Sequence, residues 1–334
     1  MQNKIDILEN DIVQQYPGVL DILLFDRTTR ENIFWATENY KDLGKEYRFK
    51  SPILSELITG ENGNVIMPRV KKDILLQQSR SREMAEVFTP SWVCNAQNNL
   101  IDNAWFGREG VFNTEIETSE GHIWKTNKSK IEFPKGKTWR DYVRDTRLEI
   151  ACGEAPYITS RYDTTTGEFI PLENRIGLLD RKLRVINENI HESTPWLKAA
   201  QDAYRSTYAY EWQGDNLLLA REAMLLTFIE NYIEKFGREP TQRSIRFIAY
   251  IISWNVWQMD GIKCVVPNSC GKVKPSQLNL FGDVLLVDNS FCDGCFNNKI
   301  RRHNGDYCII KDWSKKDIET GRKGRKTRFV DLLK

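Results

Sequence analysis

Three short segments of the chain contain the residue types that line a nucleotide-binding crevice. The turn Ala151-Cys152-Gly153 follows an apolar run, Glu211 ends a second strand-like run, and Asp260 precedes Gly261. In an open α/β sheet, a glycine-containing turn lets the backbone approach a ligand, and an acidic residue ending the second strand binds the ribose hydroxyls. A polar group near the third strand then meets the base. The order of these segments predicts a pocket for a nucleotide-type cofactor.

Together with an upstream block, these segments resemble a known family. Glu86-Val87-Phe88-Thr89-Pro90, the run Leu148–Gly153, Glu211 and Asp260 are similar, in the same order, to the cofactor-binding motifs of the amino-methyltransferases that modify adenine N6 in DNA. The likeness covers about residues 81–265. More closely, the chain resembles the short bacterial proteins labelled restriction endonuclease or modification-subunit proteins.

The resemblance implies S-adenosylmethionine as the cofactor and adenine in DNA as the methyl acceptor. The residues that it assigns to the cofactor are Phe88, Thr89, Pro90, Glu149, Ala151, Cys152, Gly153, Glu211 and Asp260. It also implies a Rossmann-like S-adenosylmethionine-dependent methyltransferase core and a restriction–modification or mobile-element setting. The exocyclic nitrogen is itself the nucleophile, so the resemblance implies direct displacement.

The chain departs from the family pattern at two places. Glu154 and Ala155 replace small residues after Gly153. The Glu154 carboxylate would either repel the carboxylate of the cofactor or grip its ammonium group. The family's catalytic tetrapeptide, Asn/Asp/Ser-Pro-Pro-aromatic, has no counterpart, because no Pro-Pro pair occurs in the chain; a weak echo is the run Asp288–Phe291 after the strand-like run Asp283–Val287, with Asp288 and Phe291 as candidate catalytic residues.

These departures leave two functional hypotheses. The first is an adenine-specific DNA methyltransferase, or one part of a split enzyme in which a second chain supplies the missing catalytic and target-recognition parts. The alternative is a non-catalytic DNA-binding or regulatory subunit that keeps the methyltransferase fold. A nuclease has no support in the sequence, since no clear Asp…Glu-x-Lys cluster is found.

The last quarter of the chain contains a candidate zinc site. Five of the seven cysteines lie there, and Cys292-Asp293-Gly294-Cys295 is a C-x-x-C knuckle. Zinc prefers four nitrogen or sulfur ligands in a tetrahedron, and a C-x-x-C turn presents two thiolates from one loop. The expected ligands are Cys270, Cys292, Cys295 and Cys308, with His303 as the alternative for one of them. The metal would be structural; the other interpretation is a set of reduced, partly buried cysteines.

The elements that must position these residues alternate along the chain. Two strand–turn–helix units are expected, at Thr146–Gly153 and at Thr207–Trp212, the second followed by a helix over 215–235; a further helix is expected over Thr241–Trp254. Alternating strands and helices indicate parallel pairing and an α/β fold. We therefore expect an N-terminal extension (1–80), a doubly wound, Rossmann-like cofactor domain (81–265) and a small Cys-rich segment (266–334).

The distribution of charge suggests a partner. Residues 296–334 contain 12 Lys/Arg and 5 Asp/Glu, a balance of +7, whereas the rest has 36 and 41, a balance of −5. A basic segment on a mildly acidic body favours a polyanion such as DNA, although a solvated tail has the same composition. No apolar run is long enough for a bilayer and no secretory signal is evident, so the expected location is cytoplasmic, without a membrane partner.

Overall fold

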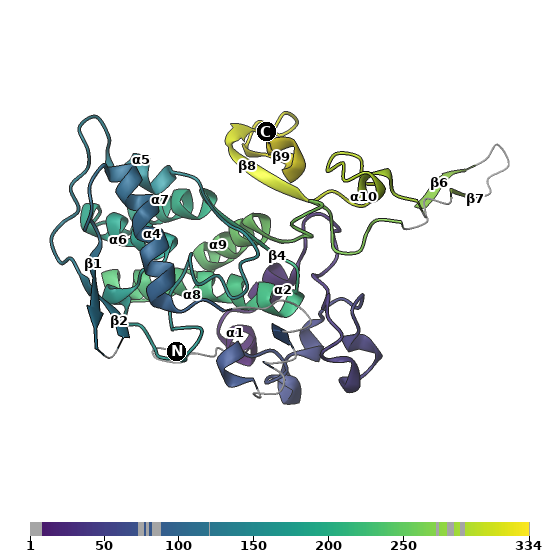
Figure 1. The fold of residues 1–334 in the computed structure, drawn as a ribbon, viewed down its shortest axis with the longest axis horizontal. Helices are drawn as coiled ribbons and strands as arrows, with labels where there is room; N and C mark the ends of the chain where they lie inside the picture. Colours follow the sequence, from purple (N-terminus) through teal and green to yellow (C-terminus); the bar gives the residue numbers. More distant parts are fainter. Residues whose placement is uncertain are drawn as a thin grey trace.

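The computed structural model describes residues 9–72, 77, 80, 81, 88–119, 121–271, 274–278, 284–287 and 291–333. The protein is a mixed α/β structure with four small sheets, and this confirms the predicted α/β class. Helices form one large part of the molecule, and the N-terminal and C-terminal segments lie beside it (Figure 1).

The central sheet consists of three parallel strands. They are β3 (Arg147–Glu149), β4 (Thr207–Glu211) and β5 (Val256–Gln258), paired in the order β3-β4-β5. The register sets Leu148 opposite Tyr208 and Glu211 opposite Gln258. Because the strands are parallel, their C-terminal ends meet at one side of the sheet, which we call the carboxyl edge. The two predicted strand segments are thus confirmed, and the third strand lies next to Asp260.

In the described chain, six helices lie between residues 91 and 255. They are α4 (Ser91–Phe106), α5 (Trp139–Arg144), α6 (Leu178–Asn189), α7 (Ser193–Arg205), α8 (Gly214–Phe236) and α9 (Gln242–Asn255). Two of them, α8 and α9, match the helices expected over 215–235 and Thr241–Trp254. Helix α8 is buried on nearly all sides, as its apolar sequence requires, and ends at Gly237, whose φ of 65° suits a glycine. Helix α9 begins after Thr241, whose hydroxyl accepts a hydrogen bond from the amide of Ser244 at 3.3 Å.

Helices cover one face of the parallel sheet. In β4, Thr207, Ala209 and Glu211 are buried, and the strand contacts α7, α8 and α9. Tyr208 and Tyr210 point to the opposite face and are only half-buried. That face meets the C-terminal segment, because the Tyr208 hydroxyl donates to the Lys311 carbonyl at 2.9 Å. Within the described residues, the second helical layer expected of a doubly wound fold is therefore replaced by a C-terminal hairpin.

The N-terminal segment shares the main hydrophobic core. Its helices are α1 (Glu9–Gln15) and α2 (Val19–Leu24), and short 3-10 turns follow at Lys41–Leu43, Lys45–Tyr47, Ser55–Leu57, Gly60–Asn62 and Arg69–Lys71. Trp35 and Ile53 are fully buried in the same cluster as the residues of α8. Helix α2 packs against α9. This segment is thus part of the core that supports the parallel sheet.

Three smaller units complete the chain. Strands β1 (Asn113–Thr118) and β2 (Gly121–Thr126) pair antiparallel. The C-terminal part contains the strands β6 (Lys274–Leu278), β7 (Val284–Val287), β8 (Ile309–Lys316) and β9 (Lys323–Arg328), the short helix α10 (Asp293–Phe296) and a final 3-10 turn, η7 (Phe329–Leu332). Another 3-10 turn, η6, spans Leu172–Asn174.

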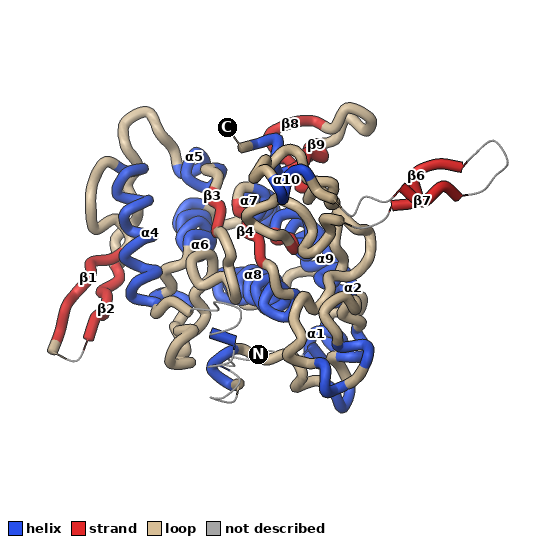
Figure 2. The backbone as a smooth tube through the Cα atoms, turned by 45° about the vertical axis from the view of Figure 1, so that its right-hand side comes forward, coloured by secondary structure: helices blue, strands red, loops and turns tan. Residues whose placement is uncertain are grey.

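The β6–β7 hairpin projects from the body of the molecule in both views (Figures 1 and 2). Among the described residues, β7 pairs with β6, antiparallel. The strand-like run Asp283–Val287 thus contains a strand over residues 284–287, but this strand lies in a separate sheet from β3, β4 and β5. Its nearest partner in sequence is β6, and local antiparallel pairing requires only a short turn.

None of the described helices is both long enough and apolar enough to cross a lipid bilayer.

Candidate functional site

The carboxyl edge brings together three of the segments singled out in the sequence. The backbone amide of Gly153 donates to Oε2 of Glu211 at 2.8 Å, although 58 residues separate them. The ring of Phe88 lies against the same turn, since a Cβ added to Gly153 would be 3.7 Å from Cζ of Phe88. Gly153 also has a φ of 53°, a conformation that glycine adopts without strain. The first-strand turn, the second-strand carboxylate and the upstream aromatic block therefore form one site.

Glu211 is held at the edge by backbone amides on both sides. Its Oε1 accepts a hydrogen bond from the amide of Gln213 at 3.1 Å, and only 7% of the residue is exposed. Burial raises the pKa of this carboxyl, and the hydrogen bonds from Gly153 and Gln213 oppose that rise. Each carboxylate oxygen has two acceptor positions, so the amide contacts leave acceptor capacity for a ligand hydroxyl.

Glu149 is a second buried carboxyl at the same edge. Its Oε1 accepts from the amide of Tyr157 at 3.4 Å, whereas its buried Oε2 has no hydrogen-bond partner among the described residues. Burial raises the pKa of Glu149 well above its ordinary value, and the nearby Glu211 carboxylate raises it further. Burial therefore favours the protonated form of this carboxyl, which would offer one O–H donor to a ligand.

The turn that follows β3 has an unusual backbone conformation. Ala151, Gly153 and Ala155 all have positive φ, at 47°, 53° and 59°. The amide of Cys152 donates to the carbonyl of Tyr210 at 2.9 Å, which fastens the turn to β4. Cys152 is 3% exposed, and burial raises the pKa of its thiol well above the ordinary value. Cys152 is therefore suited to line a pocket, and it is a poor nucleophile.

Glu154 has contacts within the chain on both of its carboxylate oxygens. Its Oε1 accepts a hydrogen bond from the amide of Arg69 at 2.7 Å, and its Oε2 accepts from the hydroxyl of Tyr162 at 2.5 Å. The Arg69 guanidinium lies 4.9 Å from the centre of the Phe88 ring. The buried Glu154 carboxylate thus joins the N-terminal segment to the turn at Gly153. It also positions Phe88 indirectly, through Arg69.

Asp260, Thr89 and Pro90 have local structural contacts. Oδ1 of Asp260 accepts from the amides of Ile262 and Lys263 at 3.0 and 3.1 Å, so the side chain organises the turn after β5. The carbonyl of Thr89 accepts from the hydroxyl of Thr164 at 3.1 Å, and Pro90 precedes the first residue of α4. Asp260 follows β5 by two residues, on the same side of the sheet as Glu211.

The N-terminal segment lies across the carboxyl edge, which the sequence did not predict. Gln258 at the end of β5 accepts from the amide of Phe34 at 3.0 Å and donates to the Phe34 carbonyl at 2.8 Å. The indole of Trp212 donates to the Ala36 carbonyl at 3.2 Å, and the amide of Gly214 donates to the Trp35 carbonyl at 3.1 Å. Contacts over more than 170 residues leave no local signal in the sequence.

Asp215, in the first turn of α8, fastens the same segment. Its Oδ2 lies 2.9 Å from Nη1 of Arg80 and 3.2 Å from Nζ of Lys72, and it accepts from the hydroxyl of Tyr40 at 2.7 Å. Burial alone would raise the pKa of Asp215, but the two cations bring it well below its ordinary value. This carboxylate stays ionised and holds Tyr40, Lys72 and Arg80 together beside the carboxyl edge.

A second site is formed by Cys270, Cys292, Cys295 and His303, which we call the Cys/His cluster. Their ligand atoms all lie within 4.8 Å of one another. Nδ1 of His303 is 3.6 Å from Sγ of Cys270 and 3.5 Å from Sγ of both Cys292 and Cys295. Tetrahedral zinc with Zn–S of about 2.3 Å and Zn–N of about 2.0 Å requires an S···N separation of about 3.5 Å. One ring nitrogen cannot hydrogen-bond three sulfurs at once, so the donor set fits a metal such as zinc.

The fourth ligand differs from the first expectation. Cys308 is fully buried, and its thiol donates to the carbonyl of Gln258 at 3.3 Å. His303, the alternative, takes the fourth position. The sequence contained a signal: Cys308 lies next to Ile309 and Ile310 at the start of a strand, whereas His303 lies in a polar turn. Cys308 belongs instead to a small core with Trp257 and Phe329.

Backbone features adapt the knuckle to its ligands. A Cβ on Gly294 would lie 2.6 Å from both the backbone nitrogen and Nδ1 of His303, so only glycine admits the histidine this closely. Although burial disfavours the Cys292 thiolate, hydrogen bonds, first among them that from the amide of Asn304, lower the pKa of Cys292 to about 6. Such N–H···S contacts stabilise a thiolate.

Phe291, the aromatic member of the weak catalytic echo, lies at the Cys/His cluster. It is 64% exposed, its ring centre is 5.4 Å from that of Phe296, and it lines a shallow hollow with Cys270, Cys292 and Cys295. Asp288, the other member, falls outside the described residues.

Comparison with protein-family models, with curated proteins and with solved structures gives no match.

Proposed function

We propose that the chain binds S-adenosylmethionine at the carboxyl edge and takes part in adenine-N6 modification of DNA. The observation that supports this most strongly is the hydrogen bond from Gly153 to Glu211, with Phe88 packed on the same glycine. On this proposal β3, β4 and β5 are the first three strands of a Rossmann-like core, whose ligand position is the carboxyl edge. Bound S-adenosylmethionine would supply an electrophilic methyl group.

The residues at the edge have chemistry that suits this cofactor. The free acceptor positions of Glu211 would take ribose hydroxyls, and the unpartnered Oε2 of Glu149 would meet a second polar group. The ring of Phe88 and the buried Cys152 would border the apolar part of the ligand. The contribution of the chain would be alignment of the reacting groups, since adenine N6 needs no activation by a covalent step.

Isothermal titration with S-adenosylmethionine tests the proposal. The wild-type protein should bind at micromolar concentrations, and Glu211→Gln should weaken binding at least tenfold. Glu117→Gln, on the exposed strand β1, removes the same charge far from the edge and should bind like the wild type. Because Glu211 also contacts backbone amides, the melting temperature of each variant must be measured in parallel. Absence of binding by the wild-type protein would contradict the proposal.

Methyl transfer separates the two functional hypotheses. Radiolabelled cofactor should label DNA with unmodified adenine and should not label DNA whose adenines are already N6-methylated. Binding without transfer would support the alternative, a non-catalytic DNA-binding or regulatory subunit. That alternative is favoured by the sequence, which lacks any Pro-Pro pair. Transfer restored only by a second protein would indicate a split enzyme.

The metal in the Cys/His cluster is proposed to be structural zinc. All four ligand positions are filled by protein side chains, as in closed structural sites, and the ligands fold the chain between β5 and β8. We propose that DNA binds to the basic C-terminal segment, residues 296–334, which has a balance of +7.

A further inference from the structure

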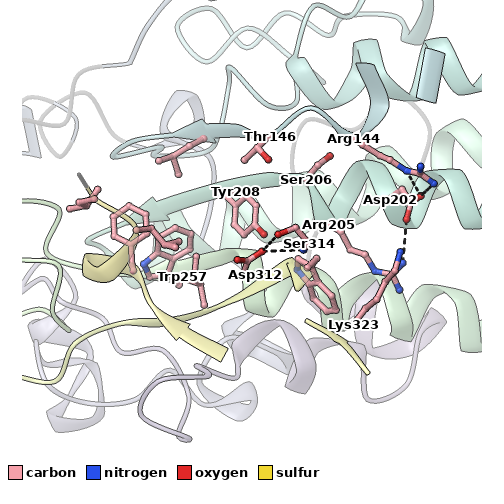
Figure 3. Close-up of a pocket in the computed structure, with 16 residues that line it drawn as sticks. Arg144, Thr146, Asp202, Arg205, Ser206, Tyr208, Trp257, Asp312, Ser314 and Lys323 are labelled. Atoms are coloured by element: carbon pink, nitrogen blue, oxygen red, sulfur yellow. Dashed lines mark hydrogen bonds and ion pairs between the residues drawn. The ribbon is translucent and has the colours of Figure 1, made fainter. Parts of the chain in front are cut away.

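A groove of about 590 Å³ lies between the helix-free face of the parallel sheet and the β8–β9 hairpin. Its floor is formed by Leu148, Tyr208 and Trp257, one residue from each parallel strand; Tyr208 and Trp257 are labelled in Figure 3. Its volume falls within the range of about 300–1,000 Å³ typical of ligand sites. The side chains on this face point away from Glu149 and Glu211, so the groove is separate from the carboxyl edge.

The floor of the groove is apolar and accessible. Leu148 is 42% exposed, and Leu332 of η7, which also lines the groove, is 43% exposed. The hydrogen bond from the Tyr208 hydroxyl to the Lys311 carbonyl fixes the aromatic ring in place. Removing this apolar surface from water is favourable, so a flat apolar group would bind there.

Cations flank the groove from separate elements. Arg144 comes from α5, Arg205 from α7 and Lys323 from β9 (Figure 3). The two acids of the lining already have partners. Asp202 lies 2.8 Å from Arg144 and 3.4 Å from Arg205, and Asp312 lies 2.9 Å from Lys315. The lining therefore has one more positive than negative charge, three against two.

The β8–β9 hairpin adds a strong positive charge beside the groove. Residues 309–328 contain 8 Lys/Arg and 3 Asp/Glu, a balance of +5. The strand register sets Lys316 opposite Lys323, which lines the groove. Lys311, opposite Lys326, donates to the hydroxyl of Tyr250 at 2.6 Å, and neither lysine lines the groove. Like charges directly opposite each other destabilise a strand pair. Within the described part of the chain, no ion pair is found for Lys316 or Lys323, so a bound polyanion would relieve the repulsion between these two lysines.

We propose that this groove binds a single-stranded segment of nucleic acid. Phosphates would lie along Arg144, Lys323 and the β8–β9 hairpin, and bases would lie on the floor formed by Leu148 and Tyr208. A cationic groove with an apolar, partly aromatic floor is the combination used for unpaired strands, whereas duplex DNA presents no free base faces. The inference depends on the groove alone and holds whether or not the carboxyl edge binds S-adenosylmethionine.

Fluorescence polarisation with a labelled dT12 oligonucleotide tests the inference. Two variants probe its two parts: Leu148→Glu places a charge on the floor, and Lys323→Gln removes a cation from the rim. The matched controls are Leu100→Glu, at a 69% exposed position of α4, and Lys45→Gln, at an exposed position of the N-terminal segment. Leu148→Glu should weaken binding at least tenfold and Lys323→Gln about threefold, while the controls bind like the wild type.

Salt dependence and competition sharpen the result. Removing one phosphate contact should reduce the slope of log K against log salt by about 0.7 in Lys323→Gln. Unlabelled single strands should displace the probe at least tenfold better than duplex DNA or polyglutamate of equal length. The inference is overturned by failure of dT12 to bind, by equal effects of Leu148→Glu and Leu100→Glu, or by polyglutamate binding as tightly as the single strand. Lys323→Gln should leave the titration with S-adenosylmethionine unchanged. A failure of the groove to bind dT12 is therefore distinguishable from a failure of the carboxyl edge to bind the cofactor.

Discussion

The carboxyl edge and the Cys/His cluster are both polar sites, but they are positioned by different forces. At the edge, Gly153 and Glu211 are held by strands that belong to the main core, and backbone amides satisfy the carboxylate. The Cys/His cluster lies outside that core, in a segment with short elements, and three sulfurs share one histidine nitrogen. The edge is therefore preorganised by packing, whereas the geometry of the cluster is one that a bound metal could hold together.

The difference predicts that metal removal has a large effect confined to one region. Structural zinc contributes about 10–16 kcal/mol of apparent binding free energy in small zinc domains, and the segment around α10 has little core to replace it. Cys295→Ser should abolish stoichiometric zinc, measured by mass spectrometry of the metal, and make residues near 291–303 sensitive to protease. The same residues should be protected in the zinc-loaded wild type.

Cys308→Ser is the matched control for that experiment. Cys308 lies in the small core and outside the cluster, so zinc content should remain near one atom per chain even if stability falls. Loss of zinc in Cys308→Ser together with retention in His303→Ala would show that the ligand set is wrong.

Gly294→Ala should have the next largest effect. The added methyl group would lie 2.6 Å from two atoms of His303, so the histidine must move away from the three sulfurs. We expect zinc affinity to fall about 10- to 100-fold, the range reported for disturbed metal surroundings. Competition with a chromophoric chelator measures this change. An unchanged affinity would mean that the histidine is not a ligand.

Glu149→Gln tests the edge through pH. The folded pKa of Glu149 is raised, so the folded state binds the proton more tightly, and its stability falls as the pH rises above the unfolded value of about 4.3. The slope is at most about 1.4 kcal/mol per pH unit and ends at the folded pKa. Urea unfolding across this interval should show a weaker pH dependence in Glu149→Gln. An identical slope in both proteins would contradict the assignment.

Gly153→Ala should have the smallest effect. Its φ of 53° costs a residue with a Cβ about 1–2 kcal/mol, while the nearest side-chain atom, in Phe88, leaves ordinary contact distance. Chemical denaturation should show a loss of that size with zinc content unchanged. A simultaneous loss of zinc would show that the carboxyl edge and the Cys/His cluster are coupled. That result would contradict the conclusion that different forces position the two sites.

Local patterns predicted much of the fold and part of each site. The run Leu217–Ile229 has helical spacing over about three and a half turns, and α8 begins and ends within one residue of the predicted helix 215–235. The strand–turn units placed Gly153 and Glu211 correctly, since parallel strands end on one side of a sheet. The C-x-x-C knuckle predicted two of the four cluster ligands, Cys292 and Cys295, because its spacing is set by one turn; Cys270 was also in the expected set, and His303 was its alternative member.

Features that depend on distant packing were missed. The contacts of Phe34 with Gln258 join residues 224 apart, and nothing near either residue in sequence indicates the other. The absence of helices from one face of the parallel sheet, among the described residues, could not be predicted. The sequence of a strand does not show which layer covers each of its faces. The pairing of β7 with β6 could not be predicted for the same reason: its apolar run fits a hairpin as well as a parallel sheet.

The Cys/His cluster joins the chain on either side of the β6–β7 hairpin, since Cys270 precedes it and Cys292 follows it. A metal ion bound there would close a loop of residues 271–291, and the entropic cost of such closure changes by only about 0.6 kcal/mol when loop length doubles. With the metal bound, the hairpin would therefore be an insert whose length and sequence can vary while the anchored ends, and the fold behind them, stay the same.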